Sequence, residues 1–172
     1  DRDLLPGHSC ITLKALPSGD LVGGTSVSAP GGGHPTATEA EIFILDWKTK
    51  KIAFHTVPVP GDGNIISIQV LADGLVYGLS GHSTFFVFDP KTRRFTNRIS
   101  VPEGNPLDLG LQNGPEGKIY GFTSSCIYRL DPVSLKIDEV IREAGVFSVP
   151  GPIVGDHIYF ATGHRLRAAA IF

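Results

Sequence analysis

The sequence repeats one strand–turn–strand pattern three times at a nearly constant spacing. Each copy has an apolar run, an aspartate, a short polar turn and a second apolar run. The copies are EIFILDWKTKKI (41–52), FFVFDPKTRRF (85–95) and CIYRLDPVSLKI (126–137). Their turn aspartates, Asp46, Asp89 and Asp131, are 43 and 42 residues apart. A fixed period near 40 residues is typical of repeat architectures, in which each repeat is one unit of supersecondary structure.

Two further extended segments precede each hairpin, so the predicted repeat has four strands. We name them A, B, C and D in chain order. Strand B is expected at GDLVGGT (19–25), GLVYGLS (74–80), GKIYGFT (117–123) and DHIYFAT (156–162). Strand A is expected at CITLKAL (10–16), IISIQVL (65–71), PLDLGLQ (106–112) and VPGPIV (149–154). Four short strands per repeat at this period predict the blades of a β-propeller.

The turns between strands C and D have a local chemical explanation. An aspartate carboxylate accepts hydrogen bonds from N–H groups just ahead of it, and Pro90 and Pro132 fix φ near −65° at the first turn position. We therefore interpret the turn aspartates as structural. The stretch IDEVIREAGV (137–146) also fits a helix, but the repeat favours strand D there.

Composition narrows the class of protein. The 172 residues suffice for one domain with a sizeable core, and 21 glycines and 13 prolines suit many tight turns. A net charge of −2 gives no electrostatic case for nucleic acid or an anionic membrane. No apolar run reaches the roughly 18 residues of a membrane span. The two cysteines, Cys10 and Cys126, fall in different repeats and do not indicate a disulfide framework.

The repeats resemble the β-propeller superfamily, especially seven-bladed proteins with a DG-x-x-Y-G…F-D-P-x-T pattern. Streptogramin-lyase, oligouronide-lyase and YVTN-type propellers are of this kind. The resemblance covers nearly the whole chain and implies an all-β fold of four-stranded blades, about four in number. We expect these blades at residues 8–63, 64–105, 106–146 and 147–172, the last with a closing strand.

The two ends of the sequence fall at particular positions in the repeat. DRDLLPG (1–7) matches the end of a strand D, and RLRAAAIF (165–172) matches a strand C. No methionine occurs, even at position 1. We expect the chain to be part of a larger propeller of the seven-bladed type. The alternative is a four-bladed ring in which residues 1–6 pair with 165–172.

Histidines gather in the loops expected on one face. In a propeller, the B–C and D–A loops emerge together, and ligands usually bind there. The residues predicted for this face are His8, His34, His82, His164 and Ser124. Three interpretations stay open: turn chemistry inherited by duplication, ligand contact by hydrogen bonding, and ligation of a divalent metal, which the oligouronide-lyase resemblance implies without a motif that carries ligands over.

Two other features bear on function. The B–C loop of the first repeat is longer than the others, since Val22 to Asp46 spans 24 residues where the equivalent spans are 12 and 11. Its extra segment, APGGGHPTATEAE (29–41), is either a binding loop or a tolerated insertion. On the opposite face, the C–D turns carry a set of cations, which we interpret as solvated charge, with an acidic partner as the alternative. They are Lys48, Lys50, Lys51, Lys91, Arg93 and Arg94.

Two functions compete. The first is a ligand-binding segment of a carbohydrate-processing, lyase-like protein, with a small-molecule or oligosaccharide ligand on the histidine-bearing face. The alternative is a non-catalytic protein–protein interaction scaffold, whose partners include further blades or another copy of the chain. Whether the chain is an enzyme stays open. The sequence has no Gly-x-Ser-x-Gly elbow and no zinc-type cysteine pairs, so neither of these motifs identifies a catalytic centre. The two readings differ in whether His34, His82 and His164 point into a common axial cavity or outward into solvent.

Overall fold

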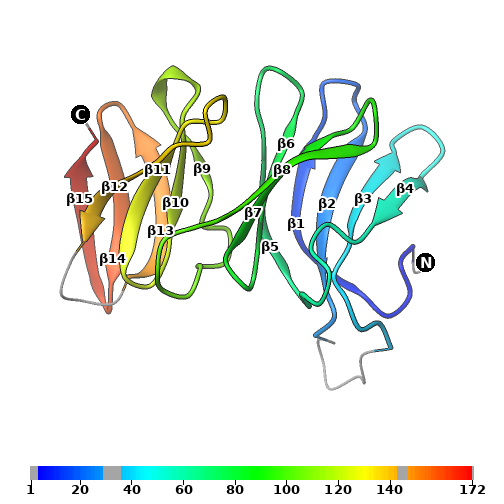
Figure 1. The fold of residues 1–172 in the computed structure, drawn as a ribbon, viewed down its shortest axis with the longest axis horizontal. Coiled ribbons are helices and arrows are strands. Elements are labelled where there is room, and N and C mark those ends of the chain that lie inside the picture. Colours follow the sequence, from blue (N-terminus) through cyan, green and yellow to red (C-terminus); the bar gives the residue numbers. More distant parts are fainter. Residues whose placement is uncertain (1–3, 29–35, 143–146, 172) are drawn as a thin grey trace. The chain divides into compact units, whose positions relative to one another are not determined.

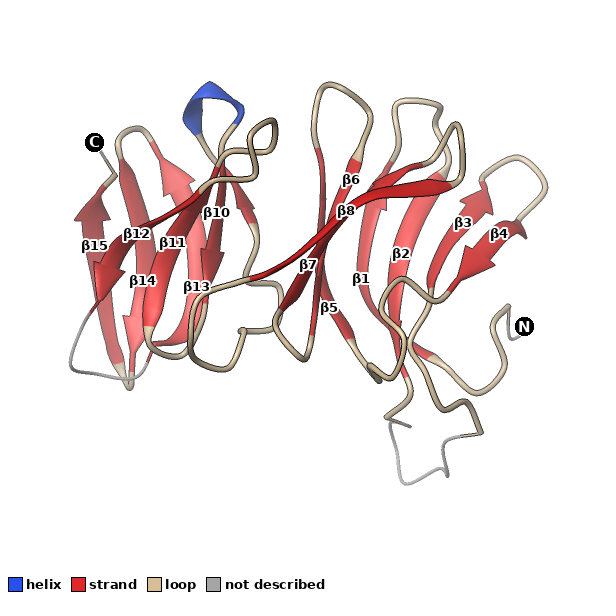
Figure 2. Ribbon diagram, viewed as in Figure 1, coloured by secondary structure: helices blue, strands red, loops and turns tan. Residues whose placement is uncertain are grey.

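The structure is a computed structural model that describes residues 4–28, 36–142 and 147–171, almost all of it β-strand and tight turn (Figures 1 and 2). It divides into two compact units, Asp1–Ile99 and Ser100–Phe172. Each unit contains two antiparallel sheets, which we call blades 1 to 4 in chain order. The predicted all-β fold of four-stranded blades is confirmed. No helix among the described residues has the length and apolar character needed to cross a membrane.

The first unit holds blades 1 and 2, in which neighbouring strands pair in chain order. Blade 1 consists of β1 (Ser9–Ala15), β2 (Leu21–Ser26), β3 (Ile42–Asp46) and β4 (Lys51–Thr56). Blade 2 consists of β5 (Ile65–Val70), β6 (Val76–Ser80), β7 (Thr84–Asp89) and β8 (Arg94–Ser100).

The second unit holds blades 3 and 4. Blade 3 consists of β9 (Gln112–Asn113), β10 (Ile119–Phe122), β11 (Cys126–Leu130) and β12 (Ile137–Arg142), with a 3-10 turn, η2 (Pro115–Gly117), between β9 and β10. Blade 4 consists of β13 (Phe147–Val154), β14 (His157–Thr162) and β15 (Arg165–Ala170). Because β12 is a strand, the helical alternative for 137–146 is wrong over residues 137–142; residues 143–146 lie outside the described part.

One expected strand differs from the structure. Strand A of blade 3 was expected over 106–112, but only Gln112 and Asn113 form a strand. Leu109 has a left-handed φ of 55°, and the Gly110 N–H donates to the Leu107 carbonyl, so a turn interrupts the strand. The N-terminal segment agrees with its expected match to the end of a strand D, since residues 4–7 form the same bend and turn as residues 58–61, which follow β4. Residues 1–3 lie outside the described part.

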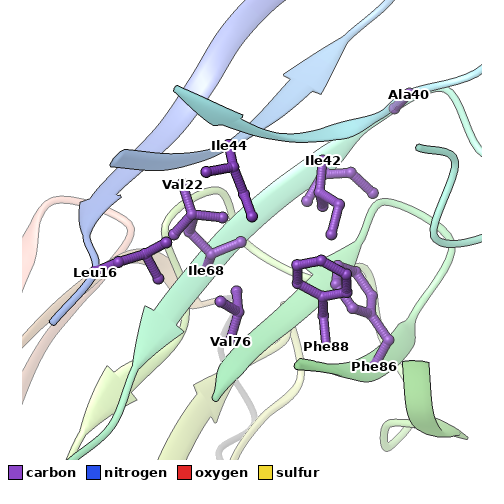
Figure 3. Packing of buried hydrophobic residues seen from close by; sticks show 10 residues of the cluster. Leu16, Val22, Ala40, Ile42, Ile44, Ile68, Val76, Phe86 and Phe88 are labelled. Atoms are coloured by element: carbon purple, nitrogen blue, oxygen red, sulfur yellow. The ribbon is translucent and has the colours of Figure 1, made fainter. Parts of the chain in front are cut away.

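The core of the first unit lies between its two sheets (Figure 3). Blade 1 contributes Val22, Ile42 and Ile44, whose side chains point toward Phe86 and Phe88 of blade 2. Phe88 stacks on Phe54 with ring centroids 5.7 Å apart. Strands covered on both sides favour β-branched and aromatic residues, which explains the composition of β3 and β7.

A comparable core forms within the second unit. Its buried members come from blade 3 and blade 4, and they are Tyr120, Phe122, Ile127, Phe147, Ile158, Phe160 and Ile171. In each unit, therefore, the second blade covers one face of the first.

Strands B and C pair a glycine with an aromatic ring in three of the four blades. The pairs are Gly23 with Phe43, Gly78 with Phe86, and Gly121 with Tyr128. A Cβ atom at any of these glycines would overlap the ring opposite. The ring therefore fills the space that a side chain on strand B would take. Blade 4 departs from this rule, with Phe160 and Arg167 at the equivalent positions.

The turn aspartates act as their spacing predicts. The Asp46 carboxylate accepts from the N–H groups of Lys48 and Thr49 at 2.8 and 2.9 Å. Asp89 accepts from the Lys91 N–H and the Thr92 hydroxyl at 2.8 and 2.9 Å. In each turn, the N–H of the fourth residue after the aspartate donates to the aspartate carbonyl, and that fourth residue has a positive φ. These residues are Lys50, Arg93 and Leu135.

Asp131 has the most interactions of the three. Its carboxylate accepts from the Lys118 ammonium and from the N–H groups of Val133 and Ser134. Hydrogen bonds from Lys118, Ser134 and Val133, in that order of effect, hold the pKa of this carboxyl well below its usual value. A carboxyl whose pKa is lower in the folded state stabilises the fold above its unfolded pKa, near 3.9, and loses that effect as pH falls toward the folded pKa.

We therefore expect Asp131→Asn to weaken the dependence of the free energy of unfolding on pH in the acid range. The wild type should lose unfolding free energy as pH falls below about 4, the unfolded pKa of aspartate. The variant should be less stable at pH 7 and should lose less on acidification. Urea unfolding across a pH series measures this, with Asp108→Asn, an exposed loop aspartate, as control. Parallel curves for Asp131→Asn and the wild type would show that this carboxylate does not stabilise the fold.

Candidate functional site

The predicted histidine-bearing loops are engaged in local structure. The His8 ring Nε2 lies 3.1 Å from the Glu39 carbonyl oxygen, and its Nδ1 is buried without a hydrogen-bond partner among the described residues. The His82 N–H donates to the buried Asp62 carboxylate at 2.8 Å, while the His82 side chain is 77% exposed. His34 lies outside the described residues.

Ser124 and His164 belong to the second unit. The Ser124 N–H donates to the Asn105 carbonyl at 2.8 Å, and its hydroxyl accepts from the Asn105 N–H at 3.0 Å. Those two bonds hold the loop to the segment before it. His164 is exposed in the tight turn between β14 and β15, where Gly163 has a φ of 58°. Convergence of the five predicted residues on one axial site stays a prediction.

Carboxylates near these loops also serve local structure. The Glu39 carboxylate accepts from the Gly61 N–H at 2.6 Å, and Asp62 also accepts from the Asn64 N–H at 3.0 Å. Glu41 pairs with His55 at 2.6 Å between its carboxylate and the ring Nδ1, a contact that sequence reasoning did not anticipate. Within residues 4–28, 36–142 and 147–171, no three histidine, cysteine, aspartate or glutamate side chains lie close enough together to hold a metal ion.

A cleft lies instead on the opposite, turn-bearing edge of the first unit. It has a volume of about 350 Å³ and is formed by the A–B turns of blades 1 and 2 together with β3, β4 and the β7–β8 turn. We call it the turn-face cleft. Its lining residues are Leu16, Pro17, Ser18, Asp20, Ile44, Ala53, Ala72, Asp73, Gly74, Pro90, Lys91 and Arg93. Leu16 and Ile44 are buried members of the core, so the cleft has an apolar floor.

The two carboxylates of the cleft are occupied by internal hydrogen bonds. Asp20 accepts from the Trp47 N–H and the Ser18 hydroxyl, both at 3.1 Å. Asp73 accepts from the Leu75 N–H at 2.8 Å and the Tyr77 hydroxyl at 2.6 Å. Burial and the bond to Asp73 both raise the pKa of Tyr77, so it stays a neutral donor. These contacts fix the shape of the turns that form the cleft.

Cations lie on the turns around the cleft, where Lys48 and Lys91 interact electrostatically with the aspartates of their own turns. Arg93 lies 5.3 Å above the Phe54 ring, and Lys50 lies 2.9 Å from the centroid of Trp47, which is 53% exposed. In the described part of the chain, none of the six cations on the β3–β4 and β7–β8 turns forms an ion pair. In contrast, cations near the corresponding turn of blade 3 are paired, Lys118 with Asp131 and Lys136 with Asp138.

A second surface stands out on blade 4. Residues of β13, β14 and β15 alternate between a face packed on blade 3 and a face that is not. Ile158 and Phe160 are buried on the first face. The second, which we call the outer face of blade 4, carries Val149, Val154, Tyr159, Leu166, Ala168 and Ala170. Of these, Leu166 is 79% exposed, and both valines are also exposed.

No protein-family model matches the sequence, and no curated protein matches it. Solved structures do match. RRP9 WD40 repeats align with 97% of this chain at a TM-score of 0.73 and 10% identity, and the Dos1 propeller with 95% at 0.71 and 11%. The Kuenenia stuttgartiensis hydrazine synthase aligns with 99% at 0.62 and 14%. The chain spans 50%, 41% and 51% of these three chains, which is about half their length or less.

At such low identity, the likeness establishes the fold alone. The matched structures include WD40 repeats and a synthase, so this fold occurs in proteins of different kinds. The expected seven-bladed lyase type is not confirmed, and a lyase-like, carbohydrate-processing function has no support here. What the sheets, the turns and the structural matches establish together is that this chain has the β-propeller fold.

Proposed function

We propose that the chain is a non-catalytic interaction scaffold, and that the outer face of blade 4 is where another propeller blade docks. In the isolated chain, a second copy supplies that blade. The observation that carries the proposal is the exposed apolar sheet face itself. Soluble monomeric proteins rarely expose contiguous apolar patches larger than roughly a few hundred Å². Patches above that size mark protein–protein contact sites.

The repeat supports a blade as the occupant. Tyr120 and Ile127 of blade 3 correspond to Tyr159 and Leu166 of blade 4 in the strand pattern. Ile127 is fully buried, because blade 4 covers that face of blade 3, whereas Leu166 is 79% exposed. Equivalent positions of the two blades therefore carry apolar side chains, which are buried in blade 3 and more exposed in blade 4. Full burial of a leucine or valine side chain stabilises by about 1.5–3 kcal/mol, so covering this face is favourable.

Two further findings favour a scaffold over a catalyst. WD40 propellers, which are among the similar structures, are generally protein–protein interaction scaffolds. The side chains of His82 and His164 are exposed, as the scaffold reading expects. Binding of a small ligand by His8, His34, His82, His164 and Ser124 stays a second, untested proposal.

We expect Leu166→Asp to abolish self-association. A charge buried in an apolar interface without a partner is strongly unfavourable, so the variant should be monomeric where the wild type is dimeric. Size-exclusion chromatography with light scattering measures the mass of each. The matched control is Val133→Asp, because Val133 is 93% exposed in a turn of blade 3, and it should leave the dimer intact. A monomeric wild type, or a Leu166→Asp variant that still dimerises, would contradict the proposal.

A further inference from the structure

We infer that the turn-face cleft binds an acidic segment of a partner protein, with one apolar side chain of that segment inserted into the cleft. This site is separate from the outer face of blade 4, and it does not depend on whether that face binds a second copy.

The excess of cations over carboxylates on the turns around the cleft indicates that the partner segment is negatively charged. The A–B and C–D turns of the first unit carry six lysines and arginines against four aspartates, in a chain whose net charge is −2. The four aspartates, Asp20, Asp46, Asp73 and Asp89, all accept hydrogen bonds within the turns. None of the six cations forms an ion pair among the described residues, although Lys48 and Lys91 interact electrostatically with the aspartates of their own turns. The turns therefore keep an excess of two positive charges. A surface of this kind attracts carboxylates and repels basic segments.

The shape of the cleft indicates an apolar anchor. A volume of about 350 Å³ lies at the small end of ligand pockets, and the floor is Leu16 and Ile44. Burying one aliphatic side chain there would cover apolar surface without leaving a polar group unpaired. Binding energy at interfaces concentrates at a few residues in well-packed pockets, and arginine is among the residues enriched there. Arg93 lines the cleft, and the backbone N–H of Trp47 is bonded to Asp20 of the cleft, so the site offers an arginine beside an apolar floor.

An extended segment fits better than a small anion. Only Lys91 and Arg93 of the six cations line the cleft. The other four lie outside the cavity: Lys48 and Lys50 on the β3–β4 turn, Lys51 at the start of β4 and Arg94 at the start of β8. A small ligand confined to the cavity would not reach them, whereas acidic residues on both sides of an apolar anchor would.

The test uses a fluorescent peptide in which one leucine is flanked on each side by glutamates, with anisotropy as the readout. We expect saturable binding that weakens as salt rises, because exposed charges are screened. Lys91→Glu combined with Arg93→Glu should weaken binding by roughly tenfold or more, since like charges now face each other. Ala72→Phe, which fills the cleft, should weaken it while leaving the cations in place. The control Lys136→Glu, on a turn of blade 3, should bind as the wild type does.

Three results would overturn the inference. They are no binding to the wild type, equal binding by the charge-reversed variant, and equal binding of a peptide with serine in place of leucine. Tighter binding of a single-stranded oligonucleotide than of the peptide would also overturn it, by assigning the cations to nucleic acid. Leu166→Asp should leave peptide affinity unchanged, so failure at one surface is distinguishable from failure at the other.

Discussion

Phe86→Ala should lower the free energy of unfolding of the first unit by about 3–5 kcal/mol, the usual cost of deleting a buried aromatic side chain. Phe86 is fully buried in the core shared by blades 1 and 2 (Figure 3). Its ring meets that of Phe95 edge-on, with ring centroids 5.8 Å apart. Its removal leaves a cavity that rigid strands on both sides cannot close. Urea unfolding followed by tryptophan fluorescence reports on this unit, since Trp47 is the chain's single tryptophan.

The matched control is Lys51→Ala in the same unit. Lys51 is exposed at the start of β4, so its truncation should change the unfolding free energy by less than about 0.5 kcal/mol. Both proteins should be compared at one concentration, because self-association adds to apparent stability. A loss below about 1 kcal/mol for Phe86→Ala would mean that the two sheets do not share the core described here.

Gly78→Ala should cost about 1–3 kcal/mol, although alanine is usually the better residue in a folded chain. The added methyl group would overlap the Phe86 ring, which is held on its other sides by the core. Overpacking therefore outweighs the reduced entropy of the unfolded chain. The same urea titration measures the loss.

A double-mutant cycle identifies the cause. In a Phe86→Leu background the ring is absent, so Gly78→Ala should cost less than it does in the wild type. Additive effects would show that the glycine is required for its backbone conformation or another contact instead of for the ring.

Much of the fold was predictable from sequence, because its determinants are local and repeated. The turn aspartates need only the next few N–H groups, and these bonds form at Asp46, Asp89 and Asp131. Strand A of blade 3 was not predictable, since its apolar pattern persists while Leu109 takes a left-handed conformation. The glycine–aromatic pairs were visible as a column of glycines in strand B. Their meaning required the cross-strand register, which places each ring over its glycine.

The candidate surfaces were harder to predict than the strands. The six cations were evident in the sequence, but their lack of ion pairs depends on where each aspartate points. The turn-face cleft gathers residues from several turns and strands, so no short motif encodes it. Leu166 reads as an ordinary strand residue, and only burial distinguishes it from Ile127. The histidines stood out as a motif, yet the described ones hold loops or face solvent.

Hydroxyl-radical footprinting of the wild type across a dilution series tests most directly whether another blade covers the outer face of blade 4. Oxidation of Leu166 and Tyr159 should fall as concentration rises through the range of self-association, because a second copy then excludes solvent from them. Oxidation of Val133 and Trp47 should stay constant, since neither lies on that face. Leu166 and Tyr159 oxidised at the same rate at every concentration would contradict the docking of another blade on this face.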